Sequence, residues 1–140
     1  MSGASDPEAP KAESAAVSIL TVEDHAATRE AVLALLGSAF PHCKLLAADS
    51  AERALELCRS AQPSLIIMDV ALPGMNGIEA TGLIRQMHPA ALIVMYSNSD
   101  MAIYREQAAS AGAAAFISKS GTARELIPTV ARMLPAARKV

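Results

Sequence analysis

The sequence contains few cysteines and no long apolar run, and each shortage excludes a class of protein. Cys43 and Cys58, the two cysteines, form no CxxC pair, so the sequence predicts neither a disulfide framework nor a zinc site. No apolar run approaches the ~20 residues of a membrane span. The N-terminus lacks the apolar segment of a signal peptide. We therefore expect free thiols, no membrane segment and a cytoplasmic location.

Basic charge is also scarce. Twelve lysines and arginines face fourteen acidic residues, which gives a formal net charge of -2. A nucleic-acid-binding surface needs a basic patch or stripe, so this chain is not expected to bind nucleic acid itself. The hydrophobic fraction of 52% is large enough to build a buried core, and proteins or small ligands are the expected partners.

Composition divides the chain into three parts. Residues 1–16 are rich in Ala, Ser, Pro and Glu, and such a stretch buries too little apolar surface to offset its ordering entropy. It is predicted to be a disordered N-terminal arm. Residues 17–134 have the pattern of apolar residues expected of a single folded domain. Residues 135–140 are interpreted as a C-terminal tail or the start of a linker.

Short apolar runs alternate with helical patterns through the whole of the predicted domain. This βα alternation predicts an α/β fold in which a five-stranded parallel sheet carries helices on both faces. The flavodoxin-like strand order 2-1-3-4-5 is the natural arrangement for five such units, and its ligand crevice lies at the carboxyl ends of strands 1 and 3. The strands are predicted over residues 17–22, 43–48, 64–68, 91–96 and 114–117.

Helix-capping residues stand at several of the predicted junctions. Ser50 is suited to cap the second helix. Asn76 followed by Glu79 is close to a capping box for the third helix. Thr122 and Glu125 have the same spacing and predict a capping box for the last helix.

Acidic residues follow the two strands that should be neighbours in the sheet. Glu23 and Asp24 leave the first strand, and Asp69 leaves the third. Three converging carboxylates repel one another unless a cation lies among them. Mg²⁺ suits such a site because it binds through one or two carboxylates and completes its shell with water and phosphate oxygen. Asp24 could instead serve only as a helix cap.

The remaining polar residues at this edge suit phosphate chemistry. A carboxylate such as Asp69 can act as a nucleophile and form an aspartyl-phosphate. Lys119, after the fifth strand, offers a flexible positive charge for a phosphate oxygen. Ser97, after the fourth strand, offers a hydroxyl donor.

This set of motifs resembles the receiver domains of two-component signalling. The resemblance covers residues 17–134, and the receivers that precede helix-turn-helix domains in transcription regulators are the most similar type. Its motifs are E-D at 23–24, D-V-A-L-P-G-M-N-G at 69–77, Ser97, and F-I-S-K at 116–119.

The resemblance implies a role for each matching residue. Asp69 would be the phosphoacceptor, and Asp69, Asp24 and the backbone carbonyl of Ala71 would hold Mg²⁺, with Glu23 reaching the ion through water. Lys119 would bind the phosphate. Ser97 and Phe116 would form a switch that changes the surface of helix 4, strand 5 and helix 5.

The resemblance also implies partners and an output. The phosphoryl donor would be a histidine kinase or a histidine phosphotransfer protein, and phosphorylation would promote a homodimer. The chain would promote only its own phosphorylation and dephosphorylation and would otherwise not be an enzyme. Whether it acts alone or as part of a longer DNA-binding regulator is left open.

Three positions differ from the commonest family pattern. Glu23 replaces the more usual Asp, which preserves the charge. Asn98 stands where Ala is frequent. Ser120 stands where many members have a proline in a cis peptide, so the geometry of the Lys119–Ser120 peptide is left open.

Three other functions fit the sequence less well. A phosphatase of the haloacid dehalogenase type needs an acid two residues after its nucleophile, where this chain has Ala71. A flavin or nucleotide binder needs a Gly-rich loop after the first strand, where this chain has Glu23 and Asp24. The intact acids and Lys119 argue against a receiver-like module that never takes phosphate.

Overall fold

A computed structural model describes residues 17–98 and 102–135 of the chain. The predicted arm at 1–16 and residues 136–140 of the predicted tail lie outside the described residues. Within the described ranges, no helix combines the length and apolar character needed to cross a membrane.

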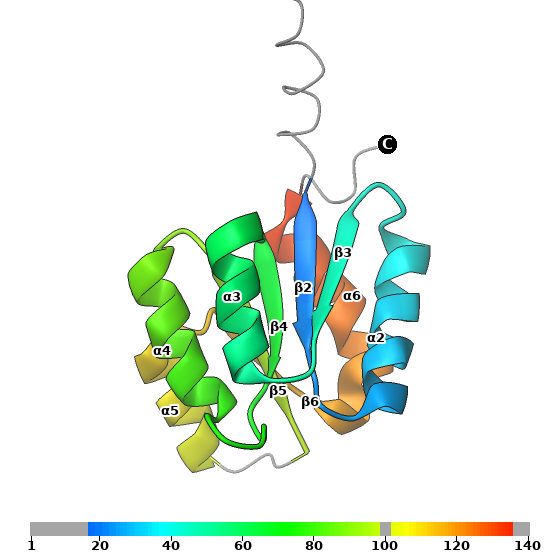
Figure 1. Cartoon of the computed structure of the whole chain (residues 1–140). Helices are drawn as coiled ribbons and strands as arrows, with labels where there is room; N and C mark the ends of the chain where they lie inside the picture. The colour runs from blue at the N-terminus through cyan, green and yellow to red at the C-terminus, as the bar shows by residue number, and fades with distance from the viewer. Residues whose placement is uncertain (1–16, 99–101, 136–140) are drawn as a thin grey trace, which may run out of the picture.

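The described residues form a five-stranded parallel sheet in the order β3-β2-β4-β5-β6 (Figure 1), which confirms the predicted order 2-1-3-4-5. Each strand begins one residue later than the apolar run that predicted it, and three strands also end one residue later. The strands are β2 (Ser18–Val22), β3 (Lys44–Ala48), β4 (Leu65–Asp69), β5 (Leu92–Ser97) and β6 (Ala115–Ser118).

Helices cover both faces of the sheet, as predicted (Figure 1). One core layer joins the sheet to α2 and α6 through residues such as Leu36 and Val130, and the other joins it to α3, α4 and α5 through residues such as Leu55, Ile84 and Ala108. The helices are α2 (Ala26–Ala39), α3 (Ala51–Ala61), α4 (Gly77–Met87), α5 (Ala102–Ala111) and α6 (Thr122–Met133), with a 3-10 turn η1 (Lys119–Gly121) before α6.

Two of the predicted caps are confirmed. The Ser50 side chain accepts a hydrogen bond from the Arg53 backbone N–H at 3.1 Å. Asn76 and Glu79 form the reciprocal capping box, with distances of 2.9 and 3.3 Å. The start of α4, directly after the loop that follows Asp69, is therefore fixed by local hydrogen bonds.

The capping box predicted at Thr122 is wrong, and the alternative role of Asp24 as a helix cap is not found. Thr122 is the first residue of α6 and Gly121 is its N-cap, without a side-chain cap hydrogen bond. The turn η1 precedes the helix, so Thr122 already has helical dihedral angles and cannot act as the cap. At α2 the N-cap is His25 rather than Asp24, again without a side-chain cap hydrogen bond.

Close packing at the end of β4 depends on Gly77. A Cβ at this position would overlap the carbonyl oxygen of Asp69, and it would lie 2.9 Å from Met68 Cγ. The Gly77 N–H donates to the carbonyl of Val70 at 3.0 Å. Glycine thus lets the first turn of α4 pack directly against the end of the strand that carries Asp69.

Candidate functional site

Lys119 joins the ends of three strands at one edge of the sheet. Its ammonium lies 3.0 Å from Asp69 Oδ2 and 2.9 Å from Glu23 Oε1. Asp69 is the last residue of β4, Glu23 follows β2, and Lys119 follows β6. The three side chains are 1%, 0% and 12% exposed, so this is a buried charge cluster rather than a surface ion pair.

Of the carboxylates of Asp69 and Glu23, that of Asp69 is less well stabilised in its ionised form. Burial raises the pKa of Asp69 to about 6, although the hydrogen bond and positive charge of Lys119 act in the opposite direction. The negative charge of Glu23 raises it further, whereas the Ala71 backbone N–H, which donates to Asp69 Oδ1 at 3.1 Å, lowers it. A second cation beside Asp69 would therefore be strongly favoured.

The pKa of Glu23 shifts in the opposite direction, below its ordinary value. Burial alone would raise the pKa of Glu23, but hydrogen bonds from Lys119, the His25 backbone N–H and the Tyr96 hydroxyl together lower it to about 2. Arg29 Nη1 also donates to the Glu23 carbonyl oxygen at 2.8 Å. Glu23 is thus a firmly held group that is ionised at neutral pH.

Asp24 supplies the unsatisfied oxygen that a metal site needs. Asp24 Oδ1 is buried without a hydrogen-bond partner, and His25 Nδ1 lies 3.5 Å away. Among the described residues, ligating atoms of Glu23, Asp24 and His25 all lie within 4.8 Å of one another. Asp69 is not part of that group. This oxygen-rich donor set fits a hard cation such as Mg²⁺.

A cavity of about 300 Å³ opens beside Asp69. Ala71 and Ser97 line it together with Asp69, and Tyr104 of α5 lines it as well. Ser97 is the last residue of β5 and is 4% exposed. The site therefore places a hydroxyl residue and the Asp69 carboxylate on the wall of one hollow.

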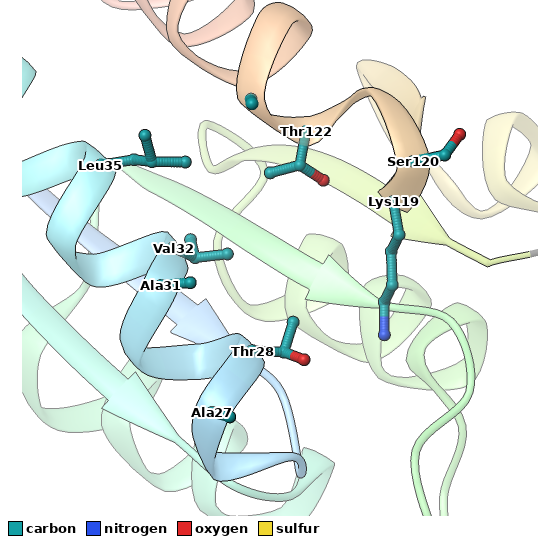
Figure 2. Close-up of a pocket in the computed structure, with 9 residues that line it drawn as sticks. Ala27, Thr28, Ala31, Val32, Leu35, Lys119, Ser120 and Thr122 are labelled. Carbon is teal, nitrogen blue, oxygen red and sulfur yellow. The ribbon is translucent and has the colours of Figure 1, made fainter.

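A larger cavity of about 450 Å³ lies between α2 and α6. Figure 2 shows Thr28 and the Lys119 side chain at one end of it and Leu35 at the other. Most of its lining is apolar, and its charged residue, Lys119, lies at one end.

Phe116, the predicted switch aromatic, lies on β6 and is half-buried against the core layer of α3, α4 and α5. The guanidinium of Arg105, on α5, lies 4.7 Å from the centroid of its ring. This is a cation–π contact between the ring and the neighbouring helix.

Tyr96 is a site residue that the sequence analysis missed. It is 1% exposed, and its hydroxyl donates to Glu23 Oε1 at 2.7 Å. The Lys119 ammonium lies 4.9 Å from its ring centroid. The available signal was a tyrosine inside a predicted buried strand, because a buried tyrosine hydroxyl usually needs a hydrogen-bond partner.

The Lys119–Ser120 peptide is trans, since the described residues contain no cis peptide bond. Ser120 instead takes part in η1, where its N–H donates to the Ser118 hydroxyl at 3.3 Å.

Comparison with known proteins gives consistent matches. The chain is 34% identical over 117 residues to the transcriptional activator protein ExaE of Pseudomonas putida, which covers 83% of this chain and 54% of that protein. Over 84 residues it is 36% identical to a protein-glutamate methylesterase/protein-glutamine glutaminase of Paramagnetospirillum magneticum, covering 60% of this chain and 24% of that protein. The chain thus spans about half the length, or less, of these relatives.

Solved structures agree with the predicted fold. A two-component response regulator of the LuxR family from Aurantimonas is 33% identical, with a TM-score of 0.79 and 86% coverage of each chain. The family model described as "Response regulator receiver domain" matches residues 19–131. The fold, the buried acidic edge and these matches together show that the chain belongs to the receiver domain family of two-component response regulators.

Proposed function

We propose that Asp69 accepts a phosphoryl group from the phospho-histidine of a histidine kinase or a histidine phosphotransfer protein. The P–N bond of the donor breaks and an O–P bond forms at the Asp69 carboxylate. The donor ring, already protonated on its other nitrogen, leaves as neutral imidazole. The supporting observation is that Asp69 is buried, lines a cavity, and has Lys119 at 3.0 Å from one carboxylate oxygen.

The proposed metal ligands are Asp24, Asp69 and the backbone carbonyl of Ala71, with Glu23 reaching the ion through water. Asp24 Oδ1, which is buried without a hydrogen-bond partner, and the raised pKa of Asp69 support a cation at this place. When bound, Mg²⁺ would neutralise charge that develops on the transferred phosphoryl group. The protein contributes a fixed set of acidic oxygens at the end of the sheet.

Lys119 and Ser97 would complete the phosphoryl site. Lys119 would move from Asp69 Oδ2 to a phosphoryl oxygen, since its side chain is a flexible point charge. The Ser97 hydroxyl would donate to another oxygen, because Ser97 lines the same cavity as Asp69. Positioning and charge neutralisation are what phosphoryl transfer chiefly requires from a protein.

The output would be a change in the surface of α5, β6 and α6. In this proposal the movement of Ser97 towards the phosphoryl group opens space that the Phe116 ring enters, and Arg105 loses its contact with the ring. This surface would then bind a partner or a second copy of the chain. A ligand shifts such an equilibrium only by its differential affinity for the two states.

We further propose that the chain is a non-enzymatic signalling domain of the cytoplasm, with residues 17–134 as its folded unit, and that the chain itself binds no nucleic acid. The name of the P. putida relative supports control of transcription as the output of a longer protein. The similarity to methylesterases covers 24% of one such relative, so it supports a shared receiver and not a shared activity.

Mg²⁺-dependent labelling by acetyl phosphate tests the phosphoacceptor. Intact-mass measurement should show one added phosphoryl group in the wild type and none in Asp69→Asn. Asp49→Asn is a matched control, because Asp49 is an exposed aspartate after β3 and should label like the wild type. Equal labelling of Asp69→Asn and the wild type would refute the assignment.

Ser97→Ala tests the switch separately from the chemistry. We expect this variant to be phosphorylated but to lose dimer formation, measured by sedimentation, and the exchange response of amides in 102–134. If phosphorylated Ser97→Ala and the phosphorylated wild type respond alike, Ser97 does not transmit the signal.

A further inference from the structure

The Glu23 carboxylate is surrounded by donors on both oxygens. Oε1 accepts from the Tyr96 hydroxyl at 2.7 Å and lies 2.9 Å from the Lys119 ammonium. Oε2 accepts from the His25 backbone N–H at 3.0 Å, and the His25 ring nitrogen lies 3.2 Å away. Glu23 is 0% exposed, so each of these donors replaces a water molecule that the carboxylate has lost.

Tyr96 contacts both members of the Glu23–Lys119 pair. Its hydroxyl donates to the carboxylate, and its ring lies 4.9 Å from the ammonium, within the range of a cation–π contact. The ammonium is therefore shared among Asp69, Glu23 and the face of Tyr96. Any step that draws Lys119 towards a phosphoryl group must reduce its contact with Glu23.

We propose that Tyr96 is a positioning residue that keeps Glu23 satisfied while Lys119 moves from the carboxylates to the phosphoryl group. The inference rests on the proposed phosphorylation of Asp69. With the hydroxyl present, Glu23 Oε1 retains a strong donor after the ammonium leaves. Without it, Lys119 would be the remaining donor to a buried charged oxygen, and its departure would leave that oxygen unpaired, which is costly.

The predicted consequence is kinetic. Tyr96→Phe removes the hydroxyl and retains the ring, so Lys119 should be held more tightly by Glu23 and be less available to the reacting phosphoryl group. The maximal rate of phosphorylation by acetyl phosphate, at saturating Mg²⁺, should fall about tenfold, in the range for losing one hydrogen bond to a charged group. The Kd for Mg²⁺ should change less than about twofold, because the Tyr96 hydroxyl donates to Glu23, which would reach the ion only through water.

Thr81→Val is the matched control. Thr81 is also fully buried, and its hydroxyl donates to Met95 Sδ at 3.8 Å, away from the charge cluster. The substitution removes a buried hydroxyl but should leave the maximal rate at the wild-type value. A rate loss in Thr81→Val equal to that in Tyr96→Phe would show a general effect of core destabilisation and would overturn the proposal.

A double-mutant cycle tests whether Tyr96 acts through Glu23. In a Glu23→Gln background the buried charge is gone, so adding Tyr96→Phe should change the maximal rate less than about twofold. If Tyr96→Phe reduces the rate equally in both backgrounds, Tyr96 does not act through Glu23. If the wild type is not labelled at all, the proposed function fails. If it is labelled and Tyr96→Phe reacts at the wild-type rate, only the role of Tyr96 fails.

A measurement without substitution gives independent evidence. The Tyr96 hydroxyl proton, bound to a buried carboxylate, should give a slowly exchanging proton resonance in protein with labelled tyrosine. The resonance should persist after addition of Mg²⁺ and beryllofluoride, a phosphoryl analogue. Its loss on that addition would mean that the Tyr96–Glu23 bond breaks in the activated state, which contradicts the proposal.

Discussion

The raised pKa of Asp69 predicts that the metal-free protein loses stability as the pH rises. The pKa is about 6 in the folded protein, against an ordinary value of 3.8. Between these values the folded state retains a proton that the unfolded chain has released, so raising the pH favours unfolding. The stabilising contribution of the neutral carboxyl is fully present below pH 3.8 and is lost as the pH rises through about 6.

The size of this loss follows from the two pKa values. At about 1.4 kcal/mol for each pH unit between them, the full effect is about 3 kcal/mol, of which about 2 kcal/mol lies above pH ~4.5. Asp69 is 1% exposed, so solvent screens this effect little. Glu23, whose pKa is lowered to about 2, gains most of its stabilising contribution below pH ~4.5, so it contributes little to the change above that value.

The assay compares wild type and Asp69→Asn by urea unfolding in a chelator, from about pH 4.5 to about pH 7.5. The free energy of unfolding of Asp69→Asn should rise relative to the wild type by about 2 kcal/mol over this range, because the amide does not ionise. Titrating groups that do not contact Asp69 contribute equally to both proteins. The two charged neighbours of Asp69 titrate outside this range, because the pKa of Glu23 is about 2 and that of Lys119 is raised above its ordinary value of 10.5. A difference that is independent of pH, or that moves in favour of the wild type, would show that Asp69 is not the carboxyl with the raised pKa.

Three further predictions concern the metal and the β4–α4 junction, each measured by thermal or urea unfolding. Saturating Mg²⁺ should stabilise the wild type but not Asp24→Ala, since a ligand of the native state alone raises stability; an unchanged response would place the ion elsewhere. Gly77→Ala should cost about 3 kcal/mol, because its Cβ would overlap the Asp69 carbonyl. Gly82→Ala lies on the same helix, and its Cβ would meet no neighbouring element within 4 Å, so it should stabilise by up to about 1 kcal/mol; equal effects would contradict this account. Asn76→Ala should cost about 1 kcal/mol through loss of the capping box, and no cost would mean that the cap is not needed.

The fold could be predicted because the periodicity of apolar residues indicates the strands and helices. The right-handedness of βαβ crossovers then restricts the order of the strands in the sheet. Continuous apolar runs such as 64–68 are typical of strands covered on both faces, and β4 is buried along its whole length. The capping box at Asn76 could be predicted for the same reason, since its hydrogen bonds join residues three apart. The strand ends then placed Asp69 and Lys119 at one edge of the sheet.

Two features were not predicted from the sequence: a hydrogen bond between distant side chains, and the boundary between β6 and α6. Tyr96 and Glu23 are 73 residues apart, and their hydrogen bond depends on the length of both side chains across the intervening strand β4. The predicted cap at Thr122 is wrong because η1 was not foreseen, and a one-turn helix leaves no periodic signal. The boundaries 17–134 and the roles of individual site residues remain predictions.

Glu23 and Asp69 share the Lys119 ammonium but have different surroundings, and this difference supports Asp69 as the phosphoacceptor. Glu23 and Asp69 both pair with Lys119, but Glu23 has further donors on both oxygens, so its lone pairs are engaged and its pKa is low. Asp69 has one further donor, from the Ala71 backbone, and lines a cavity of about 300 Å³. A nucleophile needs a free lone pair and room for the reacting group, and among these two Asp69 alone lines that cavity. Asp69 is then the carboxylate suited to react, and Glu23 is a fixed member of the charge cluster.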